Sequence, residues 1–443
     1  MKRWHGSGVI SVPVATAVGL GAIIGAGIFV LSGTAIALAG ANALFSFILV
    51  GILAVIIAVQ FGELGSIMPN AKGASFSYTY NAFGSELGFI IGILLYFSFA
   101  TAISAIALGF GSYLSSVLLL HGNNYPIMFA ILLIFILSIV NIIGIKKAAR
   151  LDSFLVLIKL LILTVFIISA VLLAHFSGTL NLNNFHGSAR QSGVLPVLSA
   201  SIAVFFAYSG FQSISTITSN VRGGASGAAR AIVLSVVISM IFYILVIFAL
   251  MLMVPASKFV ISADPLSFAL KYVRAPYSIF ILVDAGALMA TASATLAMIL
   301  TSSRVIYQIS ENKLLPGFFR KYDRKRDVPI NGVILSALIG VAMLFSGNIY
   351  IIAAISNFGL LISYLVSSLA LIHFRRNNKT GSFKTPFYPY ITVISIVMLL
   401  VFILGMPREV LDIGMILIII LLMLYYFLVE FKRDRVIHEE LFK

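Results

Sequence analysis

Apolar runs of about 20 residues recur along the whole chain, and each is long enough to cross the hydrocarbon core of a bilayer. Because a backbone in lipid must satisfy its own N–H and C=O groups, such runs predict helices. We read about twelve of them: 9–39, 42–66, 83–120, 125–145, 153–175, 194–220, 228–254, 277–307, 330–347, 350–374, 387–406 and 413–431. The sequence therefore predicts an all-α integral membrane protein.

The composition supports this prediction. Of 443 residues, 61% are apolar and 10% are charged, whereas a soluble protein carries roughly 25% charged residues. The absence of cysteine excludes a disulfide framework and thiol catalysis. No linker divides the chain, so we predict one transmembrane domain over residues 1–443.

The basic residues predict the orientation. The net charge is +15, yet of the 29 Lys and Arg residues only five fall in loops on one side: Arg190, Lys258, Lys271, Arg274 and Arg408. The others, Lys159 in a span excepted, fall in the tails and alternate loops, which the positive-inside rule assigns to the cytoplasm. We therefore expect both termini in the cytoplasm and no nucleic-acid partner.

Two spans contain glycine-centred interruptions near their middles. The first is GLGAIIGAGIF at 19–29, and the second is VFFAYSGFQSIST at 204–216, five spans later. A repeat of five helices inverts its topology in the second copy, and broken helices at matching positions mark a transporter's substrate site. We predict a first repeat at 9–175, an inverted second repeat at 194–374, and two accessory helices at 387–431.

An unwound helix in a membrane indicates a ligand. Free N–H groups at a half-helix N-terminus favour a carboxylate, and carbonyl groups at a C-terminus favour an ammonium group. A zwitterionic amino acid carries both charges and fits two such breaks. The alternative is that these glycines only allow close helix packing.

The motifs together resemble the amino acid–polyamine–organocation transporters, in particular prokaryotic amino acid permeases related to cationic amino acid transporters. The family's first-span signature is close to GxIIGxGIF, which 21–29 matches as GAIIGAGIF. The segments PNAKGASFSYTYNAFGSELGFIIG at 69–92 and SRVIYQISENKLLPGFFRKYDRKRDVP at 303–329 also match family signatures. The resemblance covers most of residues 9–387.

This resemblance implies a leucine transporter-like fold, with five plus five inverted helices of which helices 1 and 6 are broken. It implies that backbone groups of both breaks hold the substrate. The carboxylate would meet amides of the first break and the amino group carbonyls of the second: Ile24, Gly25, Ala26 and Gly27, then Phe206, Ala207 and Ser209.

Lys159 stands inside the fifth span, where a charge is costly and indicates a function. The alternative is that its side chain extends to the membrane interface. The resemblance implies proton coupling, because related permeases carry a lysine at this spacing after a GxKKxAR loop, here 144–150. Its ammonium would replace a sodium ion beside Gly21, Ala22 and hydroxyls of the eighth span such as Ser293.

Other polar positions have weaker interpretations. Thr101, Ser104, Ser293 and Asn357 are expected to line the pocket or to form interhelical hydrogen bonds. Asp284 is expected either to pair with a basic group or to end a proton path. Glu63 is expected at the membrane interface. The segment DPLSFALKY at 264–272 predicts a short helix in an outer loop.

The sequence departs from its relatives in the sixth span. Gln212 stands where many of them carry an acid, and the single tryptophan, Trp4, lies in the tail. A small or apolar neutral amino acid therefore fits better than arginine or a polyamine.

We predict a monomeric secondary active transporter in the cell membrane that takes up neutral L-amino acids with protons by alternating access. The alternatives within transport are an obligate exchanger, a sodium-coupled symporter, and a cationic amino acid or polyamine transporter. We expect no enzyme activity, metal or cofactor, because the six histidines show no ligand spacing and no nucleophile–base motif occurs. A channel is disfavoured by the paired breaks.

Overall fold

The computed structural model describes residues 10–69, 75–120, 122, 124–143, 148–176, 193–212, 214 and 221–427. Within these residues, β structure is limited to two isolated bridges, and the remainder is helix and loop. The all-α prediction is confirmed. The predicted cytoplasmic tails and most of the loop that follows the fifth span, at 177–192, lie outside the described residues.

Helices occupy all twelve predicted ranges. They are α1 (Val12–Ile23) and α2 (Gly27–Ala39), then α3 (Ala43–Ile67), α5 (Ser85–Val117), α6 (Asn124–Ile143), α7 (Ala148–Phe176), α8 (Val194–Tyr208), α9 (Gly224–Met253), α11 (Tyr277–Glu311), α12 (Ile330–Met343), α13 (Ile349–Arg376), α14 (Tyr390–Leu404) and α15 (Arg408–Tyr425). Two shorter helices, α4 (Ser75–Phe83) and α10 (Pro265–Tyr272), lie between spans. The helix predicted from DPLSFALKY is therefore present as α10.

Helix length alone identifies fewer spans. Seven helical runs among the described residues are long and apolar enough to cross a membrane, or eight if the bent pair α14–α15 counts as one. The number is below twelve because α8 and α12 are short, because α2 and α3 belong to one continuous run, and because α14 and α15 pass only as the bent pair. Both α1 and α8 are short because each ends at a predicted break.

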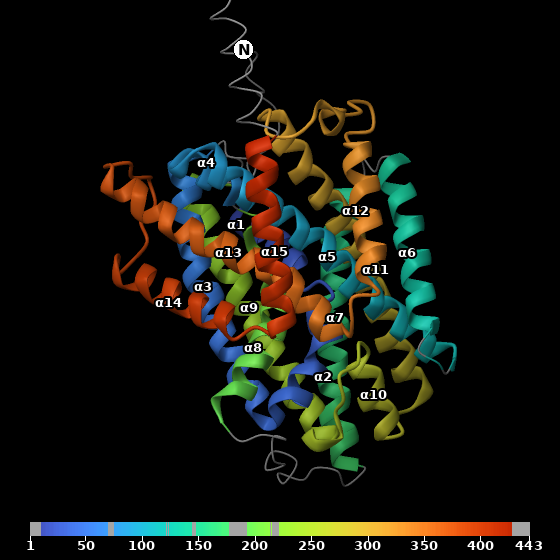
Figure 1. The fold of residues 1–443 in the computed structure, drawn as a ribbon. Helices are drawn as coiled ribbons and strands as arrows, with labels where there is room; N and C mark the ends of the chain where they lie inside the picture. Colours follow the sequence, from blue (N-terminus) through green and yellow to red (C-terminus); the bar gives the residue numbers. More distant parts are fainter. Residues whose placement is uncertain are drawn as a thin grey trace, which may run out of the picture.

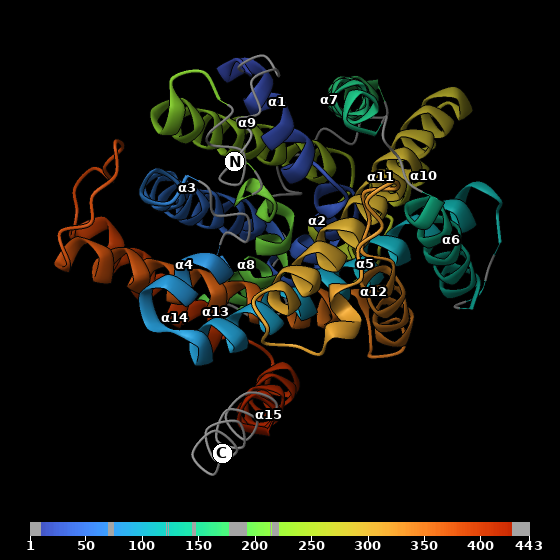
Figure 2. The ribbon, with the colours of Figure 1, turned by 90° about the horizontal axis from the view of Figure 1, so that it is seen from above.

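The helices form one bundle in which the two halves of the chain interleave (Figure 1). The half-helix α2 packs against α8, α3 against α9, and α5 against α11 and α13. Seen along the bundle axis, α6 and α15 lie at the periphery (Figure 2). The outermost helices expose large apolar side chains such as Phe135, Leu161 and Ile416, as a lipid-facing surface requires.

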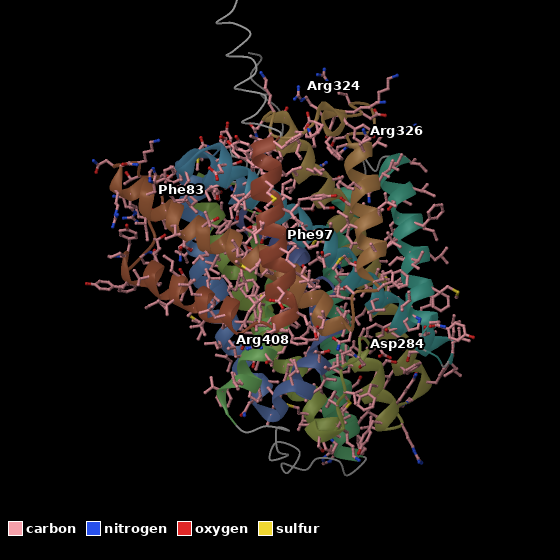
Figure 3. All side chains as sticks on the ribbon, in the orientation of Figure 1. Phe83, Phe97, Asp284, Arg324, Arg326 and Arg408 are labelled. Atoms are coloured by element: carbon pink, nitrogen blue, oxygen red, sulfur yellow. The ribbon has the colours of Figure 1, made fainter. Side chains whose placement is uncertain are left out.

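Charged residues mark the two ends of the bundle. Arg324 and Arg326 lie at one end, whereas Asp284 lies near the other, where α10 is found (Figure 3). At the Asp284 end, α10 contacts α2, α9 and α11 and carries Lys271.

Glu63, expected at the membrane interface, lies in the last turns of α3 and is enclosed by the protein. Its side chain is fully buried, and Arg375 donates to both of its oxygens, Nε to Oε1 at 2.6 Å and Nη2 to Oε2 at 2.9 Å. The amide of Thr385 donates to Oε2 at 2.7 Å, and the Arg375 guanidinium lies 4.4 Å from the Tyr388 ring centroid. This bidentate pair ties α3 to α13 and to the loop after it.

Candidate functional site

The first break separates α1 from α2 in the interior of the bundle. The α-helix ends at Ile23 and resumes at Gly27, and the residues between are buried, Ile24 fully so. The N-cap residue Ala26 offers no side chain to the first amides of α2. A helix start leaves its first N–H groups without intrahelical partners, so α2 presents uncapped amides to its surroundings.

The second break follows α8, which ends at Tyr208. Ser209 is extended, and Gly210 has φ = +116°, a conformation that only glycine adopts without strain. A Cβ at Gly210 would also overlap the carbonyl oxygen of Ala22, at 2.5 Å. Glycine is therefore required here both for its backbone angle and for the close approach of α1.

The two breaks meet each other. A side chain on Gly27 would overlap the backbone of Ala207, and Gly210 lies against Ala22. The predicted substrate-binding residues of the first and second breaks are thus neighbours in space. The positive end of α2 and the negative end of α8 converge on one buried place.

Tyr243 on α9 links the two breaks. Its hydroxyl lies 2.9 Å from the carbonyl oxygen of Ile23 and 2.8 Å from that of Ala207, and the side chain is fully buried. One hydroxyl proton is shared between the final turns of two half-helices. The bond holds the ends of α1 and α8 at a fixed separation.

The carbonyl oxygens of the second break differ in whether they can accept a further hydrogen bond, as far as the described residues show. The Phe206 oxygen already receives the Ser209 amide at 3.3 Å and the Ser209 hydroxyl at 2.8 Å. The Ala207 oxygen receives the Tyr243 hydroxyl. Since a carbonyl has two lone pairs, Ala207 retains acceptor capacity and Phe206 does not.

Gln212 stabilises the second break from the other side. Its Oε1 accepts the Gly210 amide at 3.0 Å and the Tyr364 hydroxyl, from α13, at 2.7 Å. An acceptor is therefore retained at the position where many relatives have an acid, and the negative charge is absent. No residue from Ile23 to Phe29 or from Phe206 to Gln212 is charged.

Lys159 lies on α7 and is 3% exposed. Its helix packs against α1, α9 and α11, which include the predicted neighbours Gly21, Ala22 and Ser293. Ser293 donates to the Ala290 carbonyl of its own helix at 3.1 Å. The lysine is therefore buried on a helix that packs against α1, the helix that leads into the first break. Within the described residues, no three His, Asp or Glu side chains are grouped as metal ligands would be.

The other predicted pocket residues differ in whether their polar atoms have a hydrogen-bond partner among the described residues. Ser104 donates to the Gly340 carbonyl at 2.6 Å, so it joins α5 to α12. Asn357 donates to the Ile202 carbonyl of α8 at 2.6 Å, while its Oδ1 and the Thr101 hydroxyl are buried with no hydrogen-bond partner in the described part of the chain. Gly21, Ala22, Ser209 and Ser293 are partly exposed.

The tyrosines of the site were missed at the sequence level. Tyr208 donates to the Phe47 carbonyl at 3.0 Å, and Tyr243 and Tyr364 hold the breaks as described. The available signal was a tyrosine in mid-span, since a buried phenol finds a hydrogen-bond partner. The sequence contains 17 tyrosines, and nothing local distinguishes these three.

Comparison with known proteins agrees with this geometry. A profile of the amino acid permease family matches residues 14–441, almost the whole chain. The chain belongs to the amino acid permease family. This permease is therefore a multi-pass membrane protein of a family of transporters.

Two relatives come from Bacillus subtilis (strain 168). One, named methylthioribose transporter, is 30% identical to this permease over 411 residues, covering 88% of this chain and 87% of that protein. The other, named branched-chain amino acid permease BcaP, is 27% identical over 414 residues, covering 88% and 86%.

A solved structure shares the fold. The crystal structure of a mutant of the Eremococcus coleocola manganese transporter superposes with a TM-score of 0.61 over 95% of this permease and 96% of that chain, at 15% identity. The expected leucine transporter-like fold with a broken first helix is confirmed. At this identity the similarity concerns the fold alone.

Proposed function

We propose that this permease takes up neutral L-amino acids across the cell membrane by proton-coupled alternating access. The observation that carries the proposal is the contact between Gly27 and Ala207, which brings the uncapped start of α2 to the end of α8. A single α-carbon with an amino and a carboxyl group fits between these two ends.

The substrate carboxylate would accept hydrogen bonds from the first amides of α2. Amides at a helix start bind anions without a charged side chain, because the backbone dipoles add to the hydrogen bonds. Of the candidate residues, Gly25, Ala26 and Gly27 leave the least side-chain bulk around these amides.

The substrate ammonium would donate to the carbonyl of Ala207. That oxygen holds one hydrogen bond, from Tyr243, and can accept another, whereas the Phe206 oxygen holds two from Ser209. Because both breaks lack charged side chains, the site favours a substrate whose own side chain is neutral.

Lys159 would provide the coupling. The Lys159 side chain is buried on a helix that packs against α1. When this amine is protonated, it would occupy the place of a sodium ion. When it is neutral, it would leave that place. The proton then affects transport because it binds one conformation better than the other. We place the end with Arg324 and Arg326 in the cytoplasm by the positive-inside rule, with both termini there, and expect a monomer.

Substrate class is tested by competition in proteoliposomes that take up radiolabelled leucine. Neutral L-amino acids should compete, whereas decarboxylated and N-acetylated analogues should not. Methylthioribose is included because a 30% identical relative carries that name; it has neither an α-amino nor a carboxyl group. Competition by methylthioribose, with none by amino acids, would reject the proposed substrate.

Coupling is tested with proton and sodium gradients imposed separately on wild type and Lys159→Ala. We expect proton-driven, sodium-independent accumulation that Lys159→Ala loses, while substrate exchange persists. The exposed Lys258→Ala serves as the matched control and should behave as wild type. Accumulation driven by sodium, or retained in Lys159→Ala, would contradict the role given to this lysine.

A further inference from the structure

A chain of hydrogen bonds runs from the surface of α10 to a buried carboxylate. The exposed Lys271 donates from Nζ to Ser116 Oγ at 2.6 Å, and Ser116 Oγ lies 2.6 Å from Ser267 Oγ. Ser267 donates to Asp284 Oδ2 at 3.0 Å. Ser267 and Asp284 are fully buried, and Ser116 is 8% exposed.

The donors of this chain all point the same way. An ammonium can only donate, and the single proton of Ser267 is used toward Asp284, so Ser116 must donate to Ser267. The chain therefore runs Lys271 to Ser116 to Ser267 to Asp284. The hydroxyls of Ser116 and Ser267 separate the Lys271 ammonium from the Asp284 carboxylate. No direct ion pair joins these two charged groups.

Only one of the two carboxylate oxygens of Asp284 has a hydrogen-bond partner among the described residues. Its Oδ1 is buried and accepts no hydrogen bond among the described residues. A buried ionised carboxylate with one unpaired oxygen is costly, and protonation removes that cost. The residue is therefore suited to gain and lose a proton.

The charged groups around Asp284 are few. Asp264, at the start of α10, and Lys271 both interact with it electrostatically, and so does Tyr113 on α5. The other titratable side chains on the helices packed against α11 near this end are the exposed Tyr272 on α10, Tyr125 on α6, and Lys159 and the exposed His175 on α7. The half-helix α2 contributes none.

The same cluster is attached to the first break. Tyr113 lies one helical turn before Ser116, and its hydroxyl donates to the Phe29 carbonyl at 2.6 Å. Phe29 belongs to the first turn of α2. Tyr113 thus connects α5 to the half-helix α2, which presents the amides. The hydrogen bonds of Ser116 and Ser267 connect α5 to α10 and α11.

We propose that Asp284 is a second proton-binding site of this permease, filled from the α10 surface through Lys271, Ser116 and Ser267. Lys271 gives a proton to Ser116, Ser116 gives its own to Ser267, and Ser267 gives its own to Asp284. Lys271 is left neutral and regains a proton from water. The net result is that one proton moves from water to the Asp284 carboxylate. The protonated carboxyl then donates to Ser267, and Ser267 donates to Ser116, which still accepts from the Lys271 ammonium.

The role in transport rests on the proposed function, but the binding of the proton does not. We would follow infrared difference spectra of the purified full-length protein in nanodiscs during a pH titration. Wild type should show a protonated-carboxyl band that Asp284→Asn lacks and the matched control Asp264→Asn retains. Ser267→Ala should retain the band at a shifted frequency, because the hydrogen bond to the carboxyl is lost.

Proteoliposome assays test the consequence for transport. Proton-driven uptake by Asp284→Asn should show a changed dependence on the pH at the α10 side, because only the site at Lys159 still titrates, whereas substrate counterflow, which moves no net proton, should continue. An unchanged band in Asp284→Asn, or an unchanged pH dependence of its uptake, would overturn the proposal. If Asp284→Asn does not fold, Ser267→Ala decides, since an unshifted band contradicts the chain. If no amino acid is transported, the infrared titration still tests the site.

Discussion

Ala207 occupies the space that a side chain on Gly27 would need, so the start of α2 and the end of α8 are in direct contact across the two breaks. Gly25, two residues earlier, is less constrained. A Cβ there would lie 3.4 Å from the Ala294 Cβ, an ordinary contact distance. The two glycines therefore make a matched pair for substitution.

Gly27→Ala should separate the breaks, lower the stability and weaken substrate binding, while Gly25→Ala should keep the wild-type stability. Inserting a methyl group against a packed backbone costs about 1–3 kcal/mol of stability. We expect a lower melting temperature in detergent and weaker substrate binding by scintillation proximity for Gly27→Ala. Equal stability and equal affinity of the two variants would show that the contact is unimportant.

Tyr243→Phe removes the hydroxyl that the carbonyls of Ile23 and Ala207 share. A buried carbonyl left without its donor costs about 1–3 kcal/mol, and no water replaces the hydroxyl if the ring stays in place. We expect a lower melting temperature and reduced affinity, because α1 and α8 lose their fixed separation. Ser104→Ala, which removes an interhelical bond between α5 and α12, should lower the melting temperature without changing affinity.

Glu63→Gln should destabilise the protein strongly. It removes the negative charge from a bidentate pair whose glutamate is fully buried and whose arginine side chain is 17% exposed. Breaking a buried pair costs about 3–5 kcal/mol, and the partial exposure of Arg375 places this one at the lower end. Asp327→Asn at the exposed pair with Arg304 is the control, where about 0–1 kcal/mol is expected. Similar melting temperatures for the two variants would contradict this account.

Asp264→Asn should stabilise the protein in a pH-dependent way. Burial raises the pKa of Asp264 above its usual value, and the neighbouring Lys271 only partly opposes this. The folded protein therefore holds the proton more tightly than the unfolded chain, and its stability falls as the pH rises from about 4 through the raised pKa. The melting temperature of Asp264→Asn should exceed that of wild type at neutral pH and equal it in acid. A difference that is independent of pH would contradict the role of ionisation.

The local sequence pattern determined the spans, the breaks and α10. Runs of apolar residues are properties of consecutive residues, and so are the glycines at 19–29 and the Asp–Pro start of α10. A continuous apolar run of about 20 residues satisfies its own backbone groups in a membrane as a helix, so these patterns indicate one structural outcome. The two breaks could be proposed as the substrate site on this basis, whereas the individual binding residues were implied by the resemblance to known transporters.

The tertiary structure alone decided which polar side chains pair. Glu63 and Arg375 are 312 residues apart, and nothing near Glu63 distinguishes a buried ion pair from the expected interfacial position. The same holds for Tyr243 between two breaks and for Asp284 at the end of a chain that begins at Lys271. In an apolar interior a polar group bonds to whatever donor or acceptor the packing of distant helices brings within about 3 Å, and only the assembled bundle specifies that neighbour.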